Sequence, residues 1–104
     1  MSETYRSKLE NPETDSLFDA ILSLKTYEEC YRFFEDLCTI PEVKSISQRW
    51  MVARLLNEGK TYQDIANDLA ASTATISRVN RSLQFGKDGY AVVFERLKKE
   101  SEKE

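Results

Sequence analysis

Hydroxyl and guanidinium side chains are concentrated in a short stretch that contains no acidic residue between Ser72 and Lys87. Hydroxyl groups exchange hydrogen bonds with base edges and phosphates, and arginine binds guanine through two bonds or neutralises a phosphate. A helix that is merely solvated more often alternates glutamate with lysine. The residue types therefore favour a helix that enters the major groove of double-stranded DNA. The alternative is an exposed polar helix in a small bundle. The side chains in question are Thr73, Thr75, Ser77, Arg78 and Arg81.

The spacing of apolar residues predicts a helix-turn-helix over residues 61–83. Ile65, Ala66 and Leu69 share one face of a first helix, and a second apolar face runs from Ile76 to Leu83. The small residues 70–72 lie between them and suit a tight turn. Thr61 and Ser72 precede the two helices, and each side-chain oxygen can accept from a free amide of the first turn. We expect both residues to be N-caps.

The rest of the chain predicts further helices and no sheet, because no segment alternates apolar and polar residues in steps of two. Residues 1–14 are polar and are expected to form a flexible arm, with Asp15 as the N-cap of the next helix. Thr26 is expected to open a second helix and Pro41 a third, which ends near Gly59. The fold class is thus all-α with about six helices. The expected organisation is an arm at 1–14, a helical domain at 15–97 and a charged tail at 98–104.

Length and composition limit the class of protein. A chain of 104 residues with 40% hydrophobic residues is expected to form one domain, and no apolar run is long enough to cross a membrane. The amino terminus lacks the basic segment and apolar run of an export signal. We therefore expect a cytoplasmic protein with no membrane partner.

The residues that usually carry metal or nucleophilic chemistry are scarce. The chain has two cysteines and no histidine, so neither a zinc site nor a Cys/His nucleophile can be assembled. Cys30 and Cys38 lie on one predicted helix about 12 Å apart along its axis, which is too far for a disulfide. We expect both to be buried, reduced core residues. The acidic residues show no convergent spacing for metal-dependent strand transfer, so we expect no enzymatic activity and no catalytic residue.

Charge is segregated along the sequence. The net charge is −3, which by itself argues against a nucleic-acid partner. Residues 1–47 hold ten acidic and five basic side chains, whereas residues 48–94 hold six basic and four acidic ones, a net of +2. A local basic surface can bind DNA on an acidic protein, although the long-range field assists association less.

The apolar residues before the helix-turn-helix exceed what one short helix needs on one side. Tyr27, Tyr31 and Phe34 lie on the same predicted face, with Phe33 beside them. Small helical chains of this kind commonly complete their core by dimerising, and a symmetric dimer would present two recognition helices to half-sites about 34 Å apart. The alternative is that Phe33, Phe34 and Trp50 fill the core of a monomer.

The segment from Leu55 to Leu83 resembles the tryptophan repressor, most specifically in the Ala-Thr-Ile-Ser-Arg run at 74–78. Nearly the whole chain resembles the Trp-repressor-like YerC/YecD family of Gram-positive bacteria. The resemblance implies an intertwined helical homodimer with two helix-turn-helix heads directed toward DNA. It places Gln63 on the first helix of the head, and Arg81 is added from its charge and spacing. The predicted DNA-binding residues are Gln63, Ser72, Thr73, Ala74, Thr75, Ser77, Arg78 and Arg81.

The resemblance also bears on a ligand, because the tryptophan repressor holds its corepressor between two arginines beside a glycine that leaves room for the indole. Arg78 matches one arginine and Ser82 a nearby hydroxyl, while the second arginine aligns with Gln48 or, after a shift of one residue, with Arg49. The β-branched Val79 replaces the glycine and would project toward the indole. This difference argues against L-tryptophan and leaves another small-molecule corepressor open. No other cofactor and no metal is expected.

These observations favour a sequence-specific DNA-binding transcriptional regulator that acts as a homodimer, with repression as the expected effect. An adaptor that uses the same helix-turn-helix to bind another protein is the alternative, because the acidic amino-terminal half suits a basic partner. Salt-sensitive DNA binding separates these two interpretations. The sequence discloses neither the operator nor the regulated genes.

Overall fold

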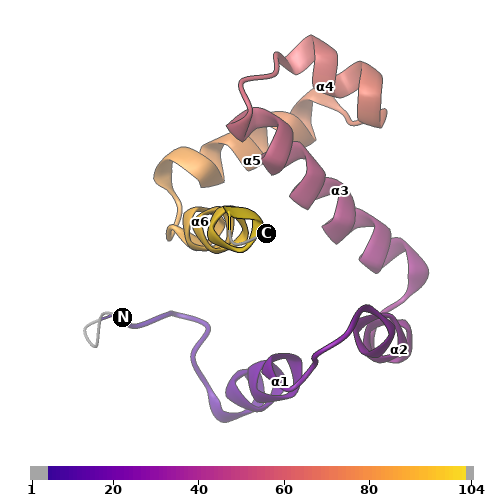
Figure 1. Cartoon of the computed structure of the whole chain (residues 1–104), viewed down its shortest axis with the longest axis vertical. Helices are drawn as coiled ribbons and strands as arrows, with labels where there is room; N and C mark the ends of the chain where they lie inside the picture. The colour runs from indigo at the N-terminus through magenta and orange to yellow at the C-terminus, as the bar shows by residue number, and fades with distance from the viewer. Residues whose placement is uncertain (1–4, 103–104) are drawn as a thin grey trace. The chain divides into compact units, whose positions relative to one another are not determined.

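The computed structural model describes residues 5–102, which form six α-helices and no strand (Figure 1). This confirms the all-α prediction. The described residues divide into two compact units, one ending at Thr39 and the other starting at Ile40. Within residues 5–102, no helix is long and apolar enough to span a membrane. The helices are α1 Pro12–Leu22, α2 Tyr27–Leu37, α3 Ile40–Asn57, α4 Tyr62–Leu69, α5 Thr73–Phe85 and α6 Gly89–Glu102.

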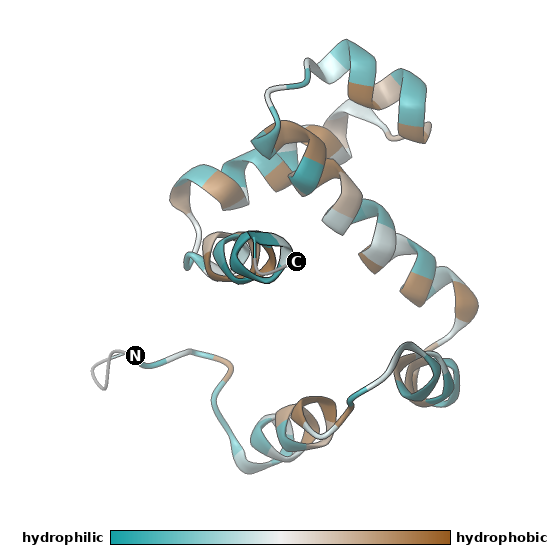
Figure 2. Cartoon of the chain, in the orientation of Figure 1, coloured by the Kyte–Doolittle hydropathy of each residue, from teal (hydrophilic) through white to brown (hydrophobic). Residues whose placement is uncertain are grey.

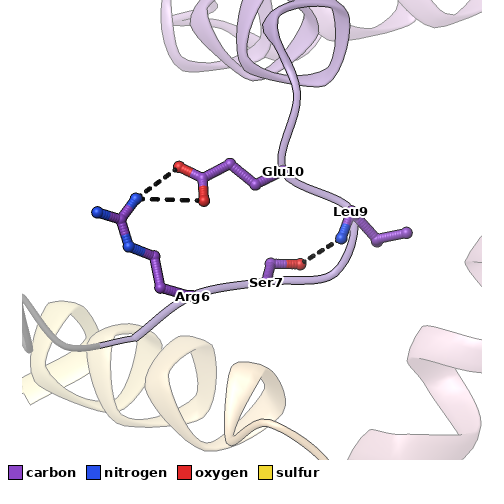
Figure 3. A network of polar contacts seen from close by, with 4 residues as sticks. All are labelled: Arg6, Ser7, Leu9 and Glu10. Atoms are coloured by element: carbon purple, nitrogen blue, oxygen red, sulfur yellow. Dashed lines mark hydrogen bonds and ion pairs between the residues drawn. The ribbon is translucent and has the colours of Figure 1, made fainter.

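The described part of the predicted arm forms a turn with hydrogen bonds of its own (Figure 3). The backbone N–H of Leu9 donates to the Ser7 hydroxyl at 3.0 Å. The Arg6 guanidinium pairs with the Glu10 carboxylate at 3.3 Å, with these side chains 78% and 47% exposed. An ion pair this exposed to water stabilises the fold little. Residues 1–4 of the predicted arm lie outside the described residues.

Helix α1 begins earlier than predicted, and the predicted cap at Asp15 is wrong. Asn11 is the N-cap, and its side-chain oxygen accepts from the backbone N–H of Thr14 at 2.8 Å. Pro12 follows at the start of the helix, where its fixed φ suits the first turn and its missing N–H costs nothing. The Asn-Pro pair therefore starts the helix, and residues 12–14 belong to α1 instead of to an arm.

Helix α2 begins where the sequence predicts. The Thr26 hydroxyl accepts from the backbone N–H of Glu29 at 3.1 Å, and the Glu29 carboxylate accepts from the N–H of Lys25 at 2.8 Å. These reciprocal bonds satisfy free amides at the helix start, as in a capping box. The confirmed cap fixes which side chains of α2 share a face.

The prediction that both cysteines are buried is wrong: Cys30 is exposed and Cys38 half-buried, and both are free thiols. Cys30 lies between Tyr27 and Tyr31 on α2, and these tyrosines are 88% and 68% exposed. The apolar face of α2 is therefore not covered by the other described residues of its own unit. The burial of a cysteine depends on which surface packs over it, and helical periodicity alone does not predict that surface.

The core lies entirely in the second unit, where α3, α4 and α5 pack together. In Figure 2 the apolar stretches of α3 and α5 meet where the two helices cross. Phe33 and Phe34 are only half-buried and contact each other edge to face at 5.5 Å. The alternative of a monomer core filled by Phe33, Phe34 and Trp50 stays a prediction, because Trp50 belongs to the other unit. The buried residues are Val52, Ala53, Ile65, Ala71, Ile76 and Val79.

A glycine turn after α3 and an aromatic cluster between α3 and α6 set the directions of the helices around this core. After α3, Gly59 adopts a left-handed φ of +89°, and the N–H of Lys60 donates to the Leu55 carbonyl at 3.0 Å. This confirms the glycine that was predicted to end the helix, since glycine takes positive φ without strain. The half-buried Trp50 of α3 stacks on Tyr90 of α6 at a ring distance of 6.3 Å and contacts Phe94 in a tilted arrangement at 5.3 Å. This aromatic cluster joins α6 to α3.

Helix α6 continues into the predicted tail, since residues 98–102 are helical. Residues 103–104 lie outside the described residues. Along α6, Val92, Val93 and Leu97 remain 46%, 42% and 51% exposed. An apolar face of this helix is thus not covered by the other helices of the second unit.

The turn between α4 and α5 carries a strained residue. Ala70 ends α4 in the left-handed conformation, with φ 53° and ψ 33°. For an L-residue other than glycine or asparagine this conformation costs about 1–2 kcal/mol. The chain adopts it because the next residue, Ala71, is 6% exposed and belongs to the core.

We predict that Ala70→Gly stabilises the protein by about 0.5–1 kcal/mol, because glycine removes the left-handed strain and loses part of that gain through unfolded-state entropy. Urea unfolding at one fixed protein concentration measures the change. The control is Ala66→Gly in the middle of α4, which should cost about 1 kcal/mol. Equal destabilisation by both substitutions would contradict the strain argument.

Candidate nucleic-acid interface

The two predicted caps of the helix-turn-helix are confirmed. The Thr61 hydroxyl accepts from the N–H of Asp64 at 3.1 Å, and the Ser72 hydroxyl accepts from the N–H of Thr75, also at 3.1 Å. Helix α4 spans 8 residues and α5 spans 13, with residues 70–72 between them. The predicted motif over 61–83 thus forms two short helices whose first turns are both satisfied by local side chains.

Helix α5 presents one face to the core and the opposite face to solvent. Ile76 and Val79 are 0% and 2% exposed and pack against the other helices of the unit. Positions three, four and seven residues apart share a helix face, so a second set lies on the outward side. Each member of this outward face is exposed: Ala74, Ser77, Arg78 and Arg81.

Two residues at the start of α5 that were predicted to bind DNA differ in their exposure to solvent. Thr73 is exposed, whereas Thr75 is half-buried and its hydroxyl accepts from the Ser72 hydroxyl at 3.0 Å. Ser72 is itself exposed. The structure therefore places the hydroxyls of Ser72, Thr73 and Thr75 at the start of α5, but the Thr75 hydroxyl is partly used inside the protein.

The outward face of α5 is electropositive. Within residues 5–102, neither Arg78 nor Arg81 forms an ion pair, and α5 contains no Asp or Glu. The next acid along the chain, Asp88, lines a groove with Asn57 and Tyr90 between α5 and α6. Two guanidinium groups one turn apart are thus free to engage an anionic ligand such as a phosphate.

On α4, Gln63 is exposed, and its amide donates to the Asn67 side-chain oxygen at 3.3 Å. The pair occupies one face of the short helix, because the two residues are four apart. The sequence-based prediction included Gln63 and missed Asn67, although the i, i+4 spacing was visible. Together they form a polar patch on the exposed side of α4.

The residues predicted for a ligand pocket differ in their surroundings. Val79 is buried in the core, at 2% exposure, and the expectation that it projects toward an indole stays a prediction. Gln48, half-buried on α3, donates to the Leu69 carbonyl at 3.4 Å and so satisfies an acceptor at the end of α4. Arg49 is exposed and Ser82 lines a separate groove with Trp50 and Tyr90. Position 48 thus serves the packing of α4 in this chain.

No metal site accompanies this surface. Across residues 5–102, no group of three or more Cys, Asp or Glu side chains is arranged to hold a metal ion. The exposed groups of α5 are hydroxyls and guanidiniums, which bind anions through hydrogen bonds and charge.

Comparison with known proteins decides the family. The sequence profile described as Trp repressor protein matches residues 12–98. The chain belongs to the Trp repressor family. The match includes all of α1 to α5 and most of α6, so the family relationship extends well beyond the helix-turn-helix.

Relatives within the Trp repressor family share both sequence and fold with this chain. The uncharacterized protein YerC of Bacillus subtilis (strain 168) is 57% identical over 91 residues, covering 88% of each protein. A TrpR-like protein from Eubacterium eligens superposes with a TM-score of 0.84 at 61% identity, over 86% of this chain and 93% of that one. A candidate Trp repressor from Staphylococcus aureus gives a TM-score of 0.84 at 53% identity, over 88% and 91%.

Membership of the Trp repressor family defines the class of function. The Trp repressor family consists of regulatory, DNA-binding helix-turn-helix proteins, which are not enzymes. The exposed face of α5 is the surface that such a motif presents to a major groove. α5 is the second helix of this motif, which is the place of the recognition helix in helix-turn-helix proteins.

We predict that Ser72→Ala lowers the free energy of unfolding by about 1 kcal/mol, because the N–H of Thr75 loses its acceptor. Ser72→Asn is the matched control and should change stability by less than about 0.5 kcal/mol, since asparagine caps a helix as well as serine does. Urea unfolding measures both variants at the same protein concentration. If the two variants were equally destabilised, the cap would not be what holds the start of α5.

Proposed function

We propose that the protein is a sequence-specific DNA-binding transcriptional regulator that represses its target genes as a homodimer. The observation that carries this proposal is the outward face of α5, where Ser77, Arg78 and Arg81 are exposed without an acidic neighbour on the helix. Membership of the Trp repressor family supports the same function. Such a regulator acts on chromosomal DNA, so we place it in the cytoplasm of a bacterial cell.

The uncovered apolar surface supports a homodimer. Residues 5–39 contain none of the buried core side chains. Exposed apolar groups of this size usually mark a protein interface in a soluble chain. A twofold dimer would also give two copies of α5, one for each half-site of a palindrome. The exposed apolar side chains of α1 and α2 are Phe18, Leu22, Tyr27, Tyr31 and Leu37.

We assign different roles to the exposed residues of the motif. The first residues of α5 enter the groove, so Thr73, Ala74 and Ser77 face base edges in this proposal. Arg78 reaches a base or a phosphate, and Arg81, one turn later, neutralises a phosphate. Ser72 and Thr75 hold the helix start near the backbone of the duplex, and Gln63 contacts a phosphate from α4.

We also propose that L-tryptophan is not a corepressor of this protein. The buried Val79 occupies the position of the glycine that leaves room for an indole in the tryptophan repressor, and Gln48 is engaged with the end of α4. A different small molecule would act by binding one arrangement of the two heads better than another. No cofactor is assigned.

Selection of bound duplexes from a random DNA pool tests the proposal, with the full-length protein at two salt concentrations and with or without L-tryptophan. We expect one palindrome to be enriched, with half-site centres about 34 Å apart, and the result to be the same with tryptophan. Affinity should fall steeply as salt rises, because bound phosphates release counterions. Absence of enrichment and of salt-dependent binding would favour an adaptor role with a protein partner.

We expect Arg78→Ala to weaken binding to the selected duplex by about 1–3 kcal/mol if the arginine reads a base. The loss should be largest on the selected sequence and smaller on duplexes changed at the contacted base pair. Fluorescence anisotropy with labelled duplexes measures it. Arg96→Ala, which removes an exposed arginine from α6, is the control and should leave affinity within about twofold. An equal loss on every duplex would make Arg78 a phosphate contact.

A further inference from the structure

Phe85 is an exposed aromatic side chain at the end of α5 that no role above explains. It is 79% exposed, although a phenylalanine usually finds apolar cover. It lies four residues after Arg81 and seven after Arg78, so the three side chains share the outward face of the helix. The core side chains Ile76 and Val79 lie on the opposite face.

The conformation after Phe85 fixes where this side chain points. The N–H of Gly86 donates to the Ser82 carbonyl at 2.9 Å and ends the helix. A Cβ atom at position 86 would clash with that same carbonyl oxygen, so only glycine allows this close approach. Phe85 therefore remains the last helical residue, in line with the two arginines.

The length of α5 places Phe85 at the wall of a major groove. Twelve residues separate Thr73 from Phe85, which is about 18 Å along the helix axis. The major groove is about 12 Å wide. When the first turn of α5 lies in the groove, its last turn is therefore level with the sugar-phosphate backbone. Arg81 precedes this point and Lys87 follows it, and both are exposed cations.

We propose that Phe85 packs against the deoxyribose groups of the DNA backbone, between phosphates bound by Arg81 and Lys87. The inference rests on the proposed function. DNA is the ligand assigned to this surface, because the apolar ring of Phe85 is continuous with the cationic face of α5, and this helix has no acidic residue. Contact with sugars is independent of base sequence. Phe85 thus contributes to the affinity for DNA of any sequence and does not contribute to specificity.

A first experiment compares Phe85→Ala with Arg81→Gln in the full-length protein, using the selected duplex and a scrambled one. We expect Phe85→Ala to lower affinity about fivefold to tenfold on both duplexes, since apolar area is no longer buried. The dependence of affinity on salt should stay unchanged, because no charge is lost. Arg81→Gln should instead reduce the salt slope by about one. An unchanged affinity for Phe85→Ala would overturn the inference while leaving the proposed function intact.

A second experiment separates DNA contact from a role in the subunit interface. In the variant Trp50→Phe with Phe85→Trp, the sole tryptophan reports on position 85, and Trp50→Phe alone gives the background. We expect saturating DNA to reduce acrylamide quenching at least threefold. Without DNA, quenching should not vary across the protein concentrations at which the dimer assembles. Protection by assembly alone would place residue 85 between subunits and overturn the inference. Failure of the parent protein to bind any duplex would overturn the proposed function as well.

Discussion

The direction in which α5 faces depends on the burial of a few aliphatic side chains between α3, α4 and α5. Ile65, Ile76 and Val52 are fully buried, and no polar or charged residue is buried beside them. Burying such a side chain contributes about 1.5–3 kcal/mol. A rotation of α5 by one position would expose Ile76 and turn Arg78 toward the core, which is costly on both counts. The exposed cationic face is therefore a consequence of the core.

This small core leaves much of the apolar surface of the chain unused. The buried side chains all lie between Val52 and Val79, whereas residues 5–39 contribute none. Two short helices without buried side chains do not cover the entropy cost of ordering their backbone. The stability of α1 and α2 thus requires a surface from outside their own unit. The helix-turn-helix, by contrast, has its cover within residues 40–102.

Features that act within three or four residues were predictable from the sequence, and those that depend on distant packing were not. The caps Thr61 and Ser72 are confirmed because each needs only an oxygen three residues before a free amide. Two local signals could start α1. The prediction placed the N-cap at Asp15, whereas the helix is capped by Asn11 and begins with the following proline. Burial of Cys30 could not be inferred, because it depends on which surface covers α2.

Val79 shows how one position can belong to the core in one protein and to a ligand site in a relative. The resemblance identified a β-branched residue where the tryptophan repressor has glycine, and its side chain was expected to project toward the indole. The structure shows the side chain 2% exposed among the residues that hold α5. Its burial adds to the stability of the helix-turn-helix whether or not a small molecule is bound. This burial within the chain's own core is the ground on which we propose DNA binding without tryptophan.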